Sequence, residues 1–230
     1  MSKSISRLGL ALLAASAAVG FGMQVSPALA EGSVPAPAAV IKANETPGLK
    51  TAVFAGGCFW GVEAVFSHVK GVTSAVSGFD GGNASTATYE RVSDGDTGHA
   101  EAVKVTYDPK IVRYDELLRV FFAVVTDPTE LNRQGPDSGT QYRNALFPQS
   151  PEQNRVAAAY LAQIKVLNPW HRPIVTRVEF GRPFYAAEGF HQDFAAHNPD
   201  HPYITRWDLP KVAALKRMFP QHWKADFTRG

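Results

Sequence analysis

Hydrophobic positions along the chain recur with a strand-like period in some segments and a helical period in others. Apolar or alternating runs predict β-strands at residues 51–57, 72–79, 100–108, 142–147 and 174–180. Apolar residues three and four positions apart predict helices at 62–69, 114–125, 151–166, 186–197 and 210–219. Strands and helices that alternate in this order predict an α+β fold, a sheet with helices packed against it.

Two long segments between these elements are rich in glycine and polar residues. They span residues 81–99 and 126–141. Loops of this length are uncommon in compact domains unless they serve a function. We therefore expect functional groups on them or directly after them, and Tyr89, Asp137 and Tyr142 are the candidate hydrogen-bonding side chains.

The first 48 residues have a pattern of their own. Lys3 and Arg7 precede an apolar run, and the small residues Ala28 and Ala30 follow it. This is typical of a secretory signal peptide, predicted at 1–30 with cleavage after Ala30; an uncleaved membrane anchor is the alternative. Residues 31–48 are predicted to be a flexible linker, and 49–230 a single domain. No later segment is long and apolar enough to span a bilayer. The protein is therefore predicted to be exported, to the periplasm in a bacterium and otherwise secreted.

Composition excludes some partners and draws attention to one residue. With 45% hydrophobic residues and a net charge of +2, the chain has no excess of positive charge for nucleic acid or an anionic membrane. Cys58 is the single cysteine. A lone cysteine in an exported chain indicates a reactive thiol or an intermolecular link, although a free cysteine is more commonly a small buried hydrophobe.

Cys58 follows a short strand and two glycines and directly precedes a helical pattern. Unpaired backbone N–H groups at a helix N-terminus favour negative charge, so this position predicts a lowered pKa and a reactive thiolate. Phe59 and Trp60 come next. They are predicted either to line a small apolar pocket beside the sulfur or to belong to the core.

Glu101 has the same parity as Val103 and Val105 in an alternating strand, on its inward face. Burial raises the pKa of a carboxyl group, so Glu101 is a candidate general acid. The alternative is that it lies just past the sheet edge, in solvent or in an ion pair.

Three other functions are compatible with these residues. Cys58 paired with His99 or His191 would suit an amidase or acyltransferase. A metal site would use the side chains in the segment 191–201, but Asn198-Pro199 interrupts the helical spacing there. The third is a protein that binds a ligand without turnover.

Four segments closely resemble the signature blocks of the A-type peptide methionine sulfoxide reductases. They are GCFWGVE (57–63), GDTGHAEAVKVTYDP (95–109), GPDSGTQYR (135–143) and PFYAAEGFHQDF (183–194). The resemblance extends from about residue 50 to at least 200. It implies a single two-layer α+β domain with a central mixed sheet, flanking helices and long loops. It also implies reduction of methionine-S-sulfoxide, free or in proteins, to methionine, and hence repair of oxidised proteins.

The resemblance implies a role for each candidate residue. Cys58 would attack the substrate sulfur and become a sulfenic acid, and Glu101 would protonate the sulfoxide oxygen. No metal or organic cofactor is implied. The other implied site residues are Tyr89 and Tyr142, which would assist Glu101; Asp137, which would hold substrate through water; and Phe59 and Trp60, which would enclose the S-methyl group.

The chain departs from many relatives because it has no second cysteine to form a disulfide with Cys58. Ser93 stands where some relatives have a resolving cysteine, and Thr126 where they often have histidine. We therefore expect an external thiol reductant, such as thioredoxin, glutaredoxin, glutathione or another dithiol. The expected partners are this reductant and oxidised proteins or peptides, without nucleic acid or stable membrane insertion, and we expect a monomer.

Overall fold

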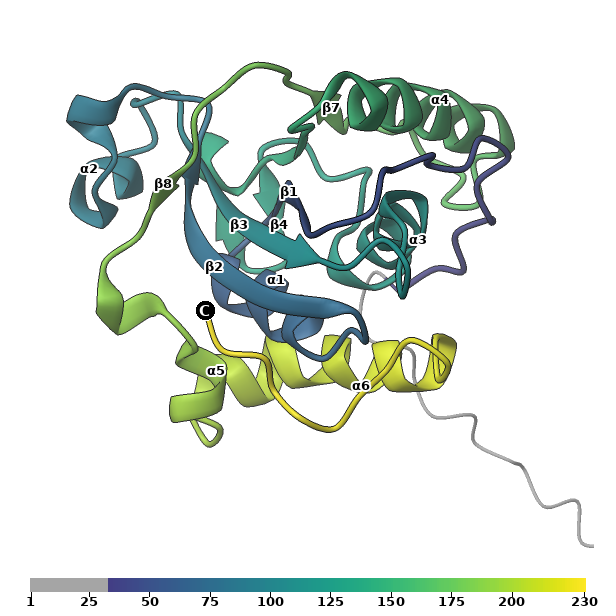
Figure 1. Ribbon diagram of the computed structural model, residues 1–230. Helices are drawn as coiled ribbons and strands as arrows, with labels where there is room; N and C mark the ends of the chain where they lie inside the picture. Colours follow the sequence, from purple (N-terminus) through teal and green to yellow (C-terminus); the bar gives the residue numbers. More distant parts are fainter. Residues whose placement is uncertain (1–32) are drawn as a thin grey trace, which may run out of the picture.

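The computed structural model describes residues 33–230 (Figure 1). The predicted signal peptide, residues 1–30, lies outside the described residues. Within the described part, the chain forms no helix that is both long and apolar enough to cross a membrane.

A six-stranded mixed sheet forms the centre of the domain, in the order β7-β6-β1-β3-β2-β8. Every neighbouring pair is antiparallel except β6 and β7, which are parallel. The strands are β1 (Lys50–Gly56), β2 (Val72–Asp80), β3 (Ala100–Tyr107), β6 (Asn144–Phe147), β7 (Arg177–Val178) and β8 (Tyr185–Ala186). A separate small ribbon pairs β4 (Arg133–Gln134) with β5 (Asp137–Ser138).

Helices flank the sheet, with α6 beside α1 and α4 near β7 (Figure 1). The α-helices are α1 (Phe59–Ser67), α2 (Tyr89–Ser93), α3 (Tyr114–Val120), α4 (Pro151–Leu167), α5 (Phe194–His197) and α6 (Leu209–Met218). π-Helical turns continue α3 (Phe121–Val125) and precede α6 (Ile204–Asp208), and 3-10 turns lie at Ala84–Thr86, Thr140–Tyr142 and Gly189–His191.

The two faces of the sheet pack differently because side chains alternate along each strand. Phe54 and Val103 lie in the main core, where the Phe54 ring stacks on Phe66 of α1 at 4.7 Å. Each fully buried ring of this kind contributes about 1.5–3 kcal/mol relative to exposure. The opposite face carries a smaller cluster of Val53, Ala55, Ala100, Ala102, Ala145 and Phe147, with Phe184 against it.

The segment before β1 differs from the predicted flexible linker, because residues 33–48 pack on α3 and α4. The Tyr160 hydroxyl donates to the Pro37 carbonyl at 2.6 Å, and Arg119 Nε donates to the Ala36 carbonyl at 3.0 Å. Glu45 accepts the backbone N–H of Tyr114 at 3.2 Å. The sequence shows no periodicity here because an extended segment satisfies its polar groups through side chains of the helices beneath it.

Two other predicted elements are shorter than expected. The strand predicted at 174–180 is reduced to β7, since the backbone N–H of Val175 bonds to the Pro128 carbonyl instead of a strand partner. The helix predicted at 186–197 is divided into a 3-10 turn and α5, because Asp193 between them has the left-handed φ of 54°. The α+β class and the single domain with a mixed sheet are confirmed.

Candidate active site

The turn between β1 and α1 places Cys58 at the N-cap of α1. Gly57 has a φ of +97°, and a Cβ there would lie 2.5 Å from Cβ of Gln134, so only glycine fits. The two glycines therefore let β1 turn tightly and leave Cys58 partly exposed at the start of the helix.

Glu101 is directly beside this helix start. Its side chain enters from the beginning of β3, is 3% exposed, and accepts the Phe59 backbone N–H at 2.9 Å through Oε2. Burial raises the Glu101 pKa to about 8, against the lowering effect of that hydrogen bond; the charge of Asp137 adds to the rise. Glu101 is therefore mostly protonated at neutral pH, and both the predicted inward orientation and the predicted rise in pKa are confirmed.

The Cys58 thiol has a raised pKa, so the prediction that the helix N-terminus would lower it is wrong. Burial is the main cause, followed by the charges of Glu101 and Asp208, while the Trp60 backbone N–H acts in the opposite direction. The helix end does not dominate because its Phe59 N–H is already occupied by Glu101. In the free protein Cys58 is a thiol at neutral pH.

The structure brings the other three predicted polar residues to the same place. Tyr89 begins α2, Tyr142 ends a 3-10 turn, and Asp137 lies in β5. Burial raises the pKa of both tyrosines, and so do the charges of Glu101, Cys58 and Asp137. Both hydroxyls are therefore close enough to the thiol and the buried acid to be affected by their charges, and both stay protonated at neutral pH.

The two aromatic residues after Cys58 have different surroundings. Phe59 is 1% exposed and belongs to the core, with its ring 6.4 Å from that of Tyr89. Trp60 is partly exposed and stacks on Phe194 at 3.8 Å, with Tyr203 edge-on at 5.9 Å. Together they form an apolar wall next to Cys58.

Tyr203 and Asp208 belong to the site without any signal in the sequence, whereas His191 lies in one of the signature segments. The Tyr203 hydroxyl donates to Asp137 Oδ2, and Asp208 is 1% exposed and adds its charge near Cys58. His191 Nδ1 accepts the Trp60 indole N–H at 3.2 Å. Tyr203 and Asp208 lie in an irregular turn about 150 residues after Cys58, where neither periodicity nor a motif marks them.

The arrangement does not favour the cysteine–histidine or metal alternatives. Within residues 33–230, neither His99 nor His191 makes a hydrogen bond with Cys58; the His99 ring instead contacts the Gly82 N–H and the Asn83 carbonyl. His197 contacts Arg229 at 2.7 Å. No group of three metal-ligating side chains gathers in the described part of the chain.

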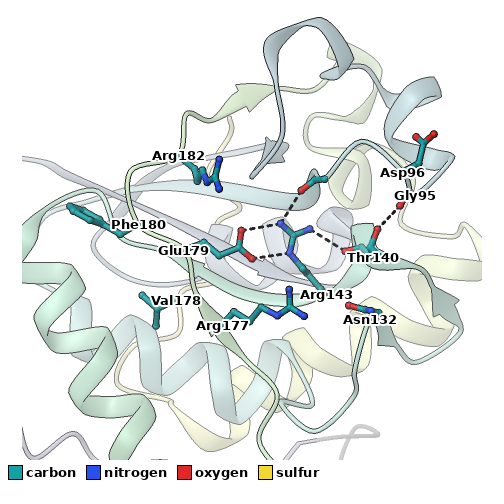
Figure 2. A pocket seen from close by; sticks show the side chains of 11 residues that line it. Gly95, Asp96, Asn132, Thr140, Arg143, Arg177, Val178, Glu179, Phe180 and Arg182 are labelled. Carbon is teal, nitrogen blue, oxygen red and sulfur yellow. Dashed lines mark hydrogen bonds and ion pairs between the residues drawn. The ribbon is translucent and has the colours of Figure 1, made fainter.

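Arg143 joins the two loops that carry the site residues, as Figure 2 shows. It is 7% exposed and donates to the carbonyls of Thr140 at 3.2 Å and Gly98 at 3.1 Å. Its guanidinium also forms a two-fold contact with Glu179 at 3.0 and 3.1 Å. These residues line an open pocket of about 860 Å³ with Arg177, Phe180 and Arg182 at its wall (Figure 2).

Comparison with known proteins agrees with this geometry. The family model described as peptide methionine sulfoxide reductase matches residues 50–223. A relative from Mesorhizobium japonicum named peptide methionine sulfoxide reductase MsrA 2 is 55% identical over 174 residues, which cover 76% of this chain and 89% of the relative. A protein of the same name from Synechocystis is 48% identical over 178 residues, 77% of this chain and 83% of that relative.

Two solved structures are similar in fold. Methionine sulfoxide reductase A of Corynebacterium diphtheriae matches with a TM-score of 0.59 and 32% identity, over 76% of this chain and 91% of that one. Mxr1 from Saccharomyces cerevisiae in its reduced form matches with a TM-score of 0.58 and 33% identity, over 70% and 92%. The chain therefore belongs to the peptide methionine sulfoxide reductase family, the oxidoreductases that reduce methionine sulfoxide to methionine.

Proposed function

We propose that this reduction takes place on Cys58, with Glu101 as the general acid, and that the S epimer of the sulfoxide is the substrate. The observation that supports it most directly is the buried Glu101, whose raised pKa of about 8 keeps a proton available next to the only thiol. Because Oε2 accepts the Phe59 N–H, the proton resides on Oε1. An acid of this kind contributes about 10²–10⁴-fold to a rate.

The first half of the cycle needs no added reductant, because Cys58 itself is oxidised. The Cys58 sulfur attacks the sulfoxide sulfur while Glu101 donates its proton to the sulfoxide oxygen, and Glu101 regains a proton from the thiol. The hydroxyl group of the adduct then moves from the substrate sulfur to the Cys58 sulfur. As the S–O and S–S bonds of the substrate sulfur break, methionine leaves as a thioether and Cys58 remains as a sulfenic acid, oxidised by the two electrons that reduce the sulfoxide. The thiol pKa is raised in the free protein. Cys58 therefore gives its proton to Glu101 only when Glu101 has passed its own proton to the substrate oxygen.

The remaining polar residues hold the substrate in this reaction. The Tyr89 and Tyr142 hydroxyls, which have raised pKa values and stay protonated, donate to the sulfoxide oxygen as it gains negative charge. Asp137, fixed by the Tyr203 hydroxyl, holds substrate through water.

The apolar wall recognises the other side of the sulfur. Phe59 and Trp60, supported by Phe194, enclose the S-methyl group. A methyl group in an apolar pocket contributes about 1 kcal/mol through removal from water. A sulfoxide with a polar group in place of the methyl group would therefore bind more weakly.

The second half of the cycle needs a thiol from outside. Cys58 is the only cysteine, so an external thiol must attack the sulfenic acid, which releases water and leaves a mixed disulfide on Cys58. A second thiol group then frees Cys58 and leaves an external disulfide. A dithiol protein of the thioredoxin or glutaredoxin type, or glutathione, has the required chemistry.

The N-terminal sequence supports export of the chain, with residues 1–30 removed. The clients would then be oxidised proteins of the periplasm, or of the exterior, and the enzyme would act as a monomer. Mass spectrometry of the N-terminus of the protein isolated from cell fractions tests this. An intact N-terminus on protein in the cytoplasm would contradict it.

The direct test of the reaction is turnover of separated S and R epimers of an N-blocked methionine sulfoxide with dithiothreitol, for the wild type and Cys58→Ser. We expect reduction of the S epimer alone, and no reduction by the variant. Reduction that persists in Cys58→Ser would overturn the proposed role of Cys58.

Trapping tests the resolving step separately. One equivalent of substrate without reductant should leave a sulfenic acid on Cys58, detectable as a dimedone adduct by mass spectrometry. A stoichiometric yield of methionine with no adduct and no mass gain on Cys58 would contradict the proposed intermediate.

A further inference from the structure

Asp208 is a buried carboxyl group with no part in the steps described so far. It ends the π-helical turn before α6, is 1% exposed, and lies against the first turn of α1. A Cβ at Gly61 would be 2.2 Å from its Oδ1, so the carboxyl group occupies the space of a side chain at position 61. Its Oδ2 has no hydrogen-bond partner among the described residues.

Such a group needs an explanation, because buried carboxyl oxygens are normally paired. The positive charge of Lys211 lowers the Asp208 pKa, and the negative charge of Asp137 raises it. Asp208 in turn acts on Cys58 and on Tyr203. Its position against the helix that begins at Cys58 therefore gives it a direct electrostatic connection to the thiol.

We propose that Asp208 is a positioning residue whose carboxylate, once charged, opposes ionisation of the Cys58 thiol in the absence of substrate. The proposal builds on the proposed role of Cys58 as nucleophile. Two carboxyl groups from separate elements, β3 and the turn before α6, thus act on a single thiol. The consequence is a cysteine that is unreactive towards stray electrophiles until a sulfoxide is bound.

The carboxyl groups around Cys58 ionise in a defined order as the pH rises. The ionisable groups that act on Cys58 are Glu101 from β3, Asp137 from β5 and Asp208; Tyr89, Tyr142 and Tyr203 also face it. Burial raises the Asp208 pKa to about 7, with Asp137 adding to the rise and Lys211 opposing it. Asp208 therefore acquires its charge near neutral pH, below the pH at which Glu101 ionises, and from there on opposes ionisation of the thiol.

The test is the rate of Cys58 alkylation by iodoacetamide as a function of pH, for the wild type and Asp208→Asn. Only the thiolate reacts, so the midpoint of the profile reports the thiol pKa. Without the charge of Asp208, the midpoint should move to lower pH. A shift of about half a pH unit corresponds to roughly threefold faster alkylation below the midpoint.

Glu63→Gln is the matched control. Glu63 is also a fully buried carboxyl group on α1, with a pKa raised to about 8. It is not among the charges that act on Cys58, so its replacement should leave the midpoint unchanged. Equal shifts in both variants would mean a general loosening of α1 and would overturn the proposal.

A second variant keeps the test decisive if Asp208→Asn does not fold. Asp208→Ser removes the same charge with a smaller side chain, so the midpoint should again move to lower pH. An unchanged midpoint in whichever of these two variants folds overturns the proposal, whatever happens to turnover. Because alkylation needs no sulfoxide, failure here is distinguishable from failure of the proposed reaction.

Discussion

Glu101 has two roles: it accepts a hydrogen bond from the start of α1, and it keeps a proton beside Cys58. Its Oε2 accepts the first N–H of α1, and burial keeps its other oxygen protonated at neutral pH. The parity of Glu101 with Val103 was enough to predict both its orientation and its raised pKa. The pKa of Cys58 was predicted wrongly, because the helix position is visible in the sequence but the carboxyl groups that fold against it are not.

Replacing Glu101 with Gln should lower kcat by about 10²–10⁴-fold, because the acid that protonates the departing oxygen is lost. An acid works in its protonated form, so wild-type kcat/KM should fall as pH rises through the Glu101 pKa of about 8. Steady-state rates between pH 6 and 9.5 measure this, with Glu63→Gln as the control of near wild-type rate. The prediction fails if Glu101→Gln retains the wild-type rate.

At the scale of elements, the loops that carry the site are joined by Arg143 and by hydrogen bonds from Thr140 to the Gly95 carbonyl and from Gln141 to the Ser93 carbonyl. Arg143 reaches the carbonyls of Gly98 and Thr140 while Glu179 orients its guanidinium. The first loop leads into the start of β3, one residue before Glu101, and the second leads into β6. The guanidinium of Arg143 is the part of this connection that contacts both loops at once, because it is planar and donates in several directions.

Arg143→Lys should reduce kcat/KM by at least about tenfold, because an ammonium group cannot reproduce the fork of hydrogen bonds made by the guanidinium. The melting temperature should fall as well, since the two-fold contact with Glu179 and the hydrogen bonds to the two carbonyls cannot all be kept by a single ammonium group. Steady-state kinetics and thermal unfolding measure the two effects. Replacing the exposed Arg177 with Lys is the control, and equal behaviour of the two variants would contradict the role of Arg143.

The regular elements were predictable where local pattern and tertiary contacts agree. The strand at 100–108 and the helix at 151–166 match β3 and α4 closely, since each shows its own period and the helix begins with the Ser150 cap. The segments at 33–48 and 186–197 depend on contacts with distant side chains. Their pattern therefore gave a flexible linker and a continuous helix, which the structure does not contain.

Removing residues 33–48 should destabilise the domain, in contrast to the removal of a flexible linker. Three buried or partly buried hydrogen bonds join this segment to α3 and α4, and each contributes about 1 kcal/mol. We expect a loss of about 2–4 kcal/mol in the free energy of unfolding on the same basis. Urea titration of chains beginning at residues 31 and 49 measures this, and identical midpoints would refute it.

At the scale of the whole molecule, the fold encloses several carboxyl groups that are neutral at mildly acidic pH. Burial raises the pKa of Glu63 and Glu101 to about 8 and of Asp80 and Asp208 to about 7. In the unfolded chain these groups ionise near pH 4. Between these limits the native state therefore binds more protons than the unfolded state.

The free energy of unfolding should consequently fall as pH rises from about 5 to about 8.5, because each of these groups opposes folding once it must ionise. Calorimetry across this range measures the effect as a falling melting temperature. Asp80→Asn should flatten the slope, since the Asp80 oxygens are buried without partners among the described residues. A melting temperature that rises over this range would contradict the prediction.

The contact between Asp208 and Gly61 has a consequence for how the sequence can vary. Any side chain at position 61 would occupy the place of the carboxyl group, so Gly61 can gain a side chain only if the residue at position 208 becomes smaller. Across the family, an alanine or serine at the position of Gly61 should occur together with a residue shorter than aspartate at the position of Asp208. Two positions nearly 150 residues apart in the sequence would then covary.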